Sequence, residues 1–172
     1  ARRKAGEKAP TEYEFRLKDK KGKRKDIFLK IGMIPGTKKS IASLMDITKR
    51  KLAEQKLKQY RFIVENAHDA IFFKDLKSRC IIVNSKTLEA FGLSQKEVIG
   101  KDDMEIMTNK EEAKTNLEDD RDVFKTGKSK IISKHMTGKD GKEYWFEAIK
   151  VPQFDDKGKI IGLIGIARDI TE

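Results

Sequence analysis

The chain is poor in the residues that build covalent or metal-bound frameworks. Among its 172 residues it has one cysteine, Cys80, and two histidines, His68 and His135. A single thiol excludes an internal disulfide, and so small a supply of cysteine and histidine excludes a Cys-rich zinc or iron–sulfur site and a multi-histidine metal centre. We therefore expect no metal site.

Long apolar segments are also missing from the sequence. No run approaches the roughly 20 residues that a membrane-spanning helix requires, and no signal peptide is present. These absences, together with the single thiol, predict a cytoplasmic location and no membrane partner. Because the first residue is Ala rather than Met, we expect the chain to be part of a longer protein.

Charge is abundant but unevenly distributed. Residues 1–58 hold 19 lysines and arginines against 7 aspartates and glutamates, whereas residues 59–172 hold 20 against 21. The lysines of the first part fall in predicted turns, strand ends and the first turn of a helix, where they protect sheet edges. They are not interleaved with aromatic stacking residues. We expect no nucleic-acid partner, and a basic nucleic-acid-binding module is kept as an alternative.

Hydrophobic patterns and capping residues predict two β-rich parts joined by a helix. After a polar lead-in, strands are expected at 14–18, 25–34 and 41–47, and a helix capped by Thr48 at 49–67. The second part is expected to hold a hairpin (70–74 and 80–84), three helices capped by Asn84, Ser94 and Asn109, and strands at 129–137, 142–152 and 159–170. The last strand is apolar on both faces, which places it in the middle of a sheet.

One stretch of the sequence occurs twice. Lys20-Lys21-Gly22-Lys23, followed by two strands and Asp46-Ile47-Thr48, matches the stretch from Lys139-Asp140-Gly141-Lys142 to Asp169-Ile170-Thr171. Because a strand–helix–strand unit fills the gap, the repeat has the period of a whole domain.

The element order of the second part, closing on Asp-Ile-Thr, resembles the PAS sensor domain. The stretches that carry the resemblance are Val64–Ile71, Val83-Asn84, Phe91–Ser94, Val98–Lys101, Asp140-Gly141-Lys142 with Trp145, and Gly162–Gly165 before Asp169. The resemblance implies an α+β fold, with a five-stranded antiparallel sheet in the order 2-1-5-4-3 and helices on one face. It predicts the last three strands of a partial PAS domain (12–48) and a complete PAS domain (68–172). The residues themselves predict a flexible lead-in (1–11) and a connecting helix (49–67).

The resemblance also implies a function. We expect a sensory, signal-transducing module of a larger protein such as a sensor histidine kinase, with an output domain elsewhere in the parent chain. The Asp-Ile-Thr ends are the expected signal exits, through Asp46, Thr48, Asp169, Ile170 and Thr171. Since the sequence shows no nucleophile–base pair, we expect that this chain has no catalytic residue and is a regulatory part rather than an enzyme. A dimerisation spacer without a ligand is the alternative.

Neither haem nor flavin is expected as a cofactor. Haem-binding PAS domains carry a ligating histidine on the long helix, and residues 109–126 have none. Photoreactive flavin domains carry their cysteine in an Asn-Cys-Arg-Phe-Leu-Gln motif on a helix, whereas Cys80 lies in a predicted strand. A small-molecule cavity is expected to have the apolar lining Ile71, Phe73, Cys80, Ile82, Leu88, Phe91, Leu117 and Phe124, unless these residues simply fill the core. Asp119 and Asp120 are expected on a solvated helix face, and the sequence names no ligand.

Residues 143–152 are apolar on both faces, although helices cover only one face of such a sheet. The entering helix or a second subunit must cover the other face. That helix has Ala53, Leu57, Tyr60, Val64 and Ala67 at heptad spacing. Because the partial sheet leaves the strand at 41–47 as a bare edge, we predict a homodimer in which residues 12–67 form much of the contact. The alternatives are that this segment stays disordered or folds onto the second domain of its own chain.

Overall fold

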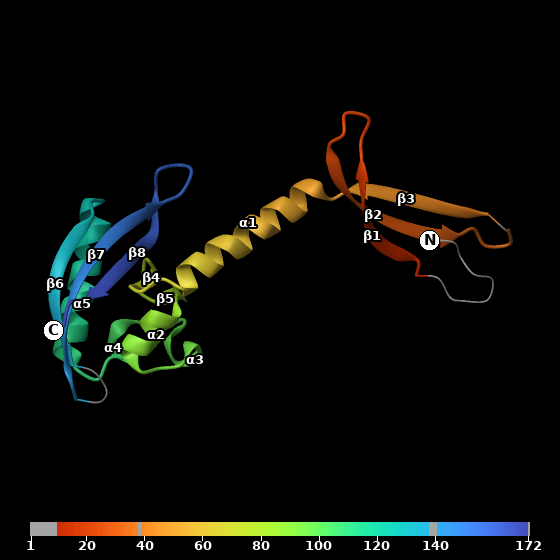
Figure 1. The fold of residues 1–172 in the computed structure, drawn as a ribbon. Helices are drawn as coiled ribbons and strands as arrows, with labels where there is room; N and C mark the ends of the chain where they lie inside the picture. Colours follow the sequence, from red (N-terminus) through yellow and green to blue (C-terminus); the bar gives the residue numbers. More distant parts are fainter. Residues whose placement is uncertain (1–9, 38, 138–140, 172) are drawn as a thin grey trace. The chain divides into compact units, whose positions relative to one another are not determined.

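The computed structural model describes residues 10–37, 39–137 and 141–171 (Figure 1). The chain divides into two compact units, residues 1–60 and residues 61–172. Helix α1 (Thr48–Glu65) begins in the first unit and ends in the second. The predicted flexible lead-in lies outside the described residues except for its last two.

The first unit is built on a three-stranded antiparallel sheet. Its strands are β1 (Glu12–Lys18), β2 (Arg24–Met33) and β3 (Ser40–Asp46), in the order β1-β2-β3. Within the described residues β3 pairs only with β2, so the prediction that this strand forms an edge is confirmed. Ile41 and Leu44 of β3 are 64% and 61% exposed, which leaves an apolar strand without cover.

The second unit has a five-stranded sheet and four further helices. Its elements are β4 (Ala70–Asp75), β5 (Cys80–Val83), α2 (Ser85–Phe91), α3 (Gln95–Val98), α4 (Asp103–Ile106), α5 (Lys110–Thr126), β6 (Lys130–Thr137), β7 (Glu143–Phe154) and β8 (Ile160–Asp169). The sheet order is β5-β4-β8-β7-β6 and every pairing is antiparallel. In chain order this is 2-1-5-4-3, so the predicted fold is confirmed and β8 is the central strand.

Capping side chains fix where most of these helices begin. The Asn84 side chain accepts a hydrogen bond from Thr87 N–H, Ser94 and Glu97 form a capping box, and the Asn109 side chain accepts from Glu111 N–H. These three predicted caps are therefore confirmed. Helix α4 was not predicted, although Asp102 and Glu105 form a capping box at its start that the sequence displays.

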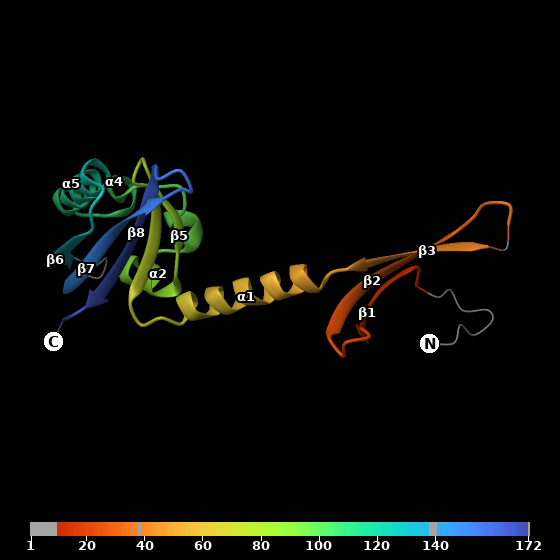
Figure 2. The ribbon, with the colours of Figure 1, turned by 90° about the horizontal axis from the view of Figure 1, so that it is seen from above.

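The helices of the second unit cover one face of its sheet, the inner face (Figure 2). Helix α5 packs on β6, β7 and β8, and α2 packs on β4. Side chains alternate between the two faces along each strand, and the buried Phe146, Ala148 and Lys150 of β7 point toward the helices. Through the strand pairing, Leu163 and Gly165 of β8 lie on the same face.

The opposite, outer face of this sheet is apolar and remains accessible. Ile82, Ile131 and Trp145 are each more than half exposed, and Val151 and Ile166 are more than one third exposed. The prediction that β7 carries apolar side chains on both faces is thereby confirmed. Exposed apolar side chains gathered on one sheet face occur at contact sites for other polypeptides.

Gly165 allows β4 and β8 to pair beneath an aromatic ring. It lies opposite Phe72, and a Cβ atom added to it would stand 2.1 Å from the Phe72 ring. We expect Gly165→Ala to lower the free energy of unfolding of the second unit by about 1–3 kcal/mol, the usual cost of overpacking. Urea unfolding followed by the fluorescence of Trp145, the single tryptophan, measures this.

The matched control is the double variant Gly165→Ala/Phe72→Leu, in which the smaller side chain leaves room for the new methyl group. We expect it to lose less stability than the sum of the two single variants, because the clash is shared between the two positions. Strict additivity would show that the ring is not what requires glycine.

Candidate functional site

A cavity of about 70 Å³ lies between the inner face of the second sheet and helices α2, α4 and α5. Residues from all five strands contribute to its wall. The apolar part is formed by Ala70, Phe72, Cys80, Ala90, Phe91, Ile132, Met136, Phe146, Ala148 and Ala167. The polar part is formed by Lys74, Thr87, Asp103, Asn116, Lys134 and Lys150. The prediction of an entirely apolar lining is therefore wrong.

Two of the eight predicted lining residues, Cys80 and Phe91, line this cavity. The other six, which do not line it, are Ile71, Phe73, Ile82, Leu88, Leu117 and Phe124. Ile82 is 58% exposed, and Leu88 packs instead against a neighbouring cluster that contains Cys80 and Val83.

The error on β4 has a simple cause. The prediction turned Ile71 and Phe73 inward because they are apolar, and a reversal of the alternation moves every side chain of a strand to the other face. The structure instead turns Ala70, Phe72 and Lys74 inward, since Lys74 is 3% exposed and finds carboxylate partners beneath the sheet. A lysine is almost never buried unless it is paired, and its partners are far away in the sequence.

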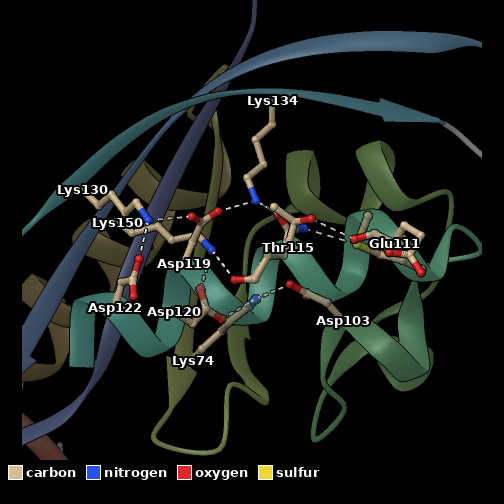
Figure 3. A network of polar contacts seen from close by, with 12 residues as sticks. Lys74, Asp103, Glu111, Thr115, Asp119, Asp120, Asp122, Lys130, Lys134 and Lys150 are labelled. Atoms are coloured by element: carbon tan, nitrogen blue, oxygen red, sulfur yellow. Dashed lines mark hydrogen bonds and ion pairs between the residues drawn. The ribbon is translucent and has the colours of Figure 1, made fainter. Parts of the chain in front are cut away.

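These partners form a buried network of four charges: Lys74, Asp103, Asp120 and Lys150 (Figure 3). Lys74 Nζ donates to Asp103 Oδ2 at 2.7 Å and to Asp120 Oδ2 at 3.0 Å. Lys150 Nζ donates to Asp120 Oδ1 and, at 2.9 Å, to the backbone oxygen of Asn116. The network joins β4 and β7 to α4 and α5, and its four charges sum to zero.

The surroundings of these groups shift their pKa values in directions that follow from burial and pairing. Burial alone would raise the pKa of Asp120, but the ammonium groups of Lys74 and Lys150 outweigh it and hold that pKa below its ordinary value. Burial would lower the pKa of Lys74, but the carboxylates of Asp103 and Asp120 raise it overall. Burial dominates at Lys150 and lowers its pKa, because Asp120 is shared and Lys74 repels it.

A second set of ion pairs lies next to this network, around Asp119. Its carboxylate pairs with Lys130 Nζ at 2.8 Å and with Lys134, whose Nζ also donates to Asn116 Oδ1 at 2.7 Å. Asp119 is 7% exposed and Asp120 is fully buried. The prediction that both lie on a solvated helix face is wrong, because α5 turns them toward the lysines of β6 and β7.

The remaining candidate nucleophile and metal ligands do not form a site. Burial raises the pKa of the Cys80 thiol to about 12, so it stays protonated at neutral pH and is a poor nucleophile. His68 is exposed, while the His135 ring lies beside that of Trp145, tilted by 60° at a centroid distance of 5.2 Å. In the part of the chain that the structure describes, no three His, Cys, Asp or Glu side chains gather as a metal ion would require.

The two Asp-Ile-Thr triplets form the same hydrogen-bond motif. In the first unit, Ile47 N–H donates to Asp26 O at 2.9 Å, and Asp26 N–H donates to Thr48 Oγ1 at 2.9 Å. Thr48 N–H then donates to Asp46 Oδ1 at 3.0 Å. Each triplet residue thus takes one defined part in closing the sheet.

The second unit repeats this motif on β7. Ile170 N–H donates to Trp145 O at 2.8 Å, Trp145 N–H donates to Thr171 Oγ1 at 2.9 Å, and Thr171 N–H donates to Asp169 Oδ1 at 2.9 Å. The sequence repeat is therefore also a repeat of local structure. The five predicted relay residues lie in these two motifs, one at the end of each sheet.

In the first unit the motif leads directly into a helix. Thr48 is the first residue of α1, and its hydroxyl donates to Asp46 Oδ1 at 2.6 Å. These hydrogen bonds and the ion pair with Lys25 lower the pKa of Asp46 to about 2. The carboxylate is therefore ionised over the physiological range and holds the start of α1.

The buried network predicts that substitutions of two aspartates of α5 lower the free energy of unfolding by very different amounts. Asp120→Asn removes the carboxylate that two buried lysines share, and an uncompensated buried charge costs about 3–5 kcal/mol of stability. Asp122→Asn is the matched control on the same helix, because Asp122 is 61% exposed in its pair with Lys130 and such pairs contribute less than about 1 kcal/mol. Urea unfolding at pH 7 measures both, and equal losses would contradict the network's role.

The same pair of variants predicts a pH dependence. The pKa of Asp120 in the folded state lies below its ordinary value of 3.8, so its contribution to stability is complete above that value and is lost as the pH falls through the folded-state pKa. We therefore expect acidification from pH 6 to pH 3 to destabilise the wild type more than Asp120→Asn. Parallel pH profiles would contradict this.

Comparison with known proteins agrees with the geometry. Residues 68–172 match the PAS domain family model. The chain is 39% identical over 117 residues to the methanogenesis regulatory histidine kinase FilI of Methanothrix harundinacea (strain 6Ac), and 29% identical over 119 residues to the aerobic respiration control sensor protein ArcB of Escherichia coli (strain K12). These matches cover 67% and 69% of this chain but span only 13% and 15% of the two relatives.

A solved structure, VqmA bound to DPO, superposes with a TM-score of 0.61 at 28% identity, covering 66% of this chain and 57% of that chain. No helix within the described residues is long and apolar enough to cross a membrane. The sheet order, the helices on its inner face and the match over residues 68–172 lead to one conclusion: the chain belongs to the PAS domain family and contains a PAS sensory module similar to those of sensor histidine kinases.

Proposed function

We propose that the second unit senses a small molecule in its cavity and passes the signal out through Asp169, Ile170 and Thr171. The cavity carries this proposal, because it combines an apolar wall with a few converging polar groups, which is typical of a ligand site. The likeness to VqmA bound to DPO supports a small ligand.

The repeated motif supports the proposed route of the signal. In the first unit, Thr48 of the triplet is the first residue of α1. In the second unit, the triplet that ends at Thr171 makes the same three hydrogen bonds. Strand β7 carries both Lys150, which lines the cavity, and Trp145, which holds Thr171. A ligand that displaces β7 would therefore displace the residue from which a following helix starts.

We also propose that the module works within a longer cytoplasmic sensor kinase whose output domain lies elsewhere in the parent chain. The two curated relatives are a regulatory histidine kinase and a respiration control sensor, and this chain spans only 13% and 15% of them. In this arrangement the described chain is regulatory and the parent protein supplies any catalysis. The residues at 12–48 would be the last strands of a preceding PAS domain.

Dimerisation is the remaining part of the proposal. Leu57 and Tyr60 of α1 are 68% and 64% exposed, and β3 presents an uncovered apolar edge strand. Exposed apolar residues at heptad spacing are typical of helices that pair with a second helix. A second copy of this chain is the simplest partner, because it supplies the same surface by two-fold symmetry.

A screen of metabolites by thermal shift tests the sensing function. A ligand that binds only the folded state raises the melting temperature as its concentration exceeds its dissociation constant. We expect at least one metabolite to raise the melting temperature of the wild type and to have no effect on Ala148→Leu, in which a larger side chain fills the cavity. If no metabolite stabilises the wild type, the alternative of a spacer without a ligand is favoured.

The proposed relay predicts a separation of signalling from stability. In a full-length sensor kinase that carries this module, Asp169→Ala should abolish control of the kinase output, while the melting temperature changes little because Asp169 is exposed. Asp156→Ala, at an exposed turn of the same unit, is the matched control and should leave control intact. Normal regulation in Asp169→Ala would refute the proposed exit.

The proposed dimer predicts that the mass of the protein in solution depends on the exposed apolar residues of α1. Light scattering at micromolar concentration should give twice the chain mass, and Leu57→Lys should shift the protein toward monomer because it places a charge in the contact. Gln55→Lys, on the same exposed helix but off the heptad positions, is the matched control and should remain dimeric. A monomeric wild type, or a dimer that survives deletion of residues 1–48 unchanged, would count against this contact.

A further inference from the structure

One carboxylate oxygen of Asp103, a residue of the cavity wall, has no partner in the described part of the chain. Asp103 is 1% exposed, and its Oδ2 accepts from Lys74, but its Oδ1 finds no hydrogen-bond donor among the described residues. A buried carboxylate oxygen without a donor is costly, more so than a neutral acceptor. Because Asp103 lines the cavity, the missing donor can come from a molecule inside it.

The charges around the cavity are already balanced. Lys74 and Lys150 are paired with Asp103 and Asp120, and Lys134 is paired with Asp119. An ionised ligand would therefore bring an uncompensated charge into a buried site, which is unfavourable. The rest of the wall is apolar and includes the rings of Phe72, Phe91 and Phe146.

The volume of the cavity limits the size of the ligand. A volume of about 70 Å³ is roughly half that of an engineered cavity that binds benzene, so the part of the ligand that it holds is small. A larger open hollow of about 470 Å³ shares Ala70, Ala90, Phe146 and Ala167 with the cavity, so the two adjoin. Asp169 also lines this outer hollow.

From these observations we infer that the cavity takes an uncharged small molecule, or the uncharged end of one, that presents an N–H or O–H group to Oδ1 of Asp103. The inference rests on the proposed sensing function and specifies its ligand class. A ligand without such a group leaves the buried carboxylate oxygen unpaired, which costs affinity. The donor is therefore a requirement for tight binding.

Three five-membered rings of similar size test the inference on the unmodified chain. Pyrrole is uncharged and has an N–H donor, furan is uncharged and has none, and pyrrolidine has N–H donors but is a cation at pH 7. Each is titrated at millimolar concentrations, because ligands of so few atoms bind weakly. The readout is the backbone amide NMR signals of Thr87, Ala90 and Asp103, with Ile27 of the first unit as the internal control.

We expect pyrrole to shift the three cavity signals and to bind about tenfold or more tightly than furan, the effect of one hydrogen bond to a charged group. Pyrrolidine should also bind more weakly than pyrrole. Ala90→Leu, which places a larger side chain in the wall that the two hollows share, should abolish the pyrrole shifts. The comparison of the three rings in the wild type stands alone if this variant does not fold.

The outcomes separate this inference from the proposed function. Equal binding of furan and pyrrole at the cavity signals would overturn the donor requirement and leave sensing intact, and tighter binding of pyrrolidine would overturn the requirement for an uncharged ligand. If no ring shifts these signals, the inference fails, and the metabolite screen decides independently whether the cavity senses a ligand.

Discussion

The structure of the second unit depends on the shared carboxylate of Asp120. Lys74 and Lys150 enter the interior from two strands that β8 separates, and Asp120 meets both of them from α5. Two ammonium groups at this depth are tolerated only while carboxylates face them. The position of α5 over the sheet is thus set by charge pairing as well as by apolar contact, and the helix cannot slide without separating a buried pair.

This constraint also shapes the functional site. The network forms the polar wall of the cavity, and it leaves one oxygen of Asp103 without a donor while the total charge remains zero. It further connects the cavity to the end of the sheet, because Lys150 and Trp145 lie on the same strand and Trp145 holds Thr171. The wall of the cavity and the Asp169-Ile170-Thr171 motif are therefore linked through a single strand.

The sequence was sufficient to predict the fold but not the interior of the site. Turn residues and helix caps are local signals and predicted the elements, and the apolar faces of the last strand predicted its central place. The complete sheet order and the edge strand β3 followed from the resemblance to PAS domains. The lining of the cavity depends on which side chains of β4 turn inward. A lysine such as Lys74 is expected to face solvent, and its partners Asp103 and Asp120, which allow it to be buried, are 29 and 46 residues away in the sequence. Buried ion pairs between distant residues leave no periodic pattern, so Asp119 and Asp120 were assigned to solvent.

The most direct test of this account is to observe the ammonium groups of Lys74 and Lys150 by ¹⁵N-detected side-chain NMR, assigned with Lys→Met variants. The buried network predicts two NH₃⁺ signals that exchange with water far more slowly than those of exposed lysines at neutral pH. As the pH is raised, Lys150 should lose its proton before Lys74, since burial lowers the pKa of Lys150 while two carboxylates raise that of Lys74. Fast exchange at both positions, or titration in the opposite order, would contradict it.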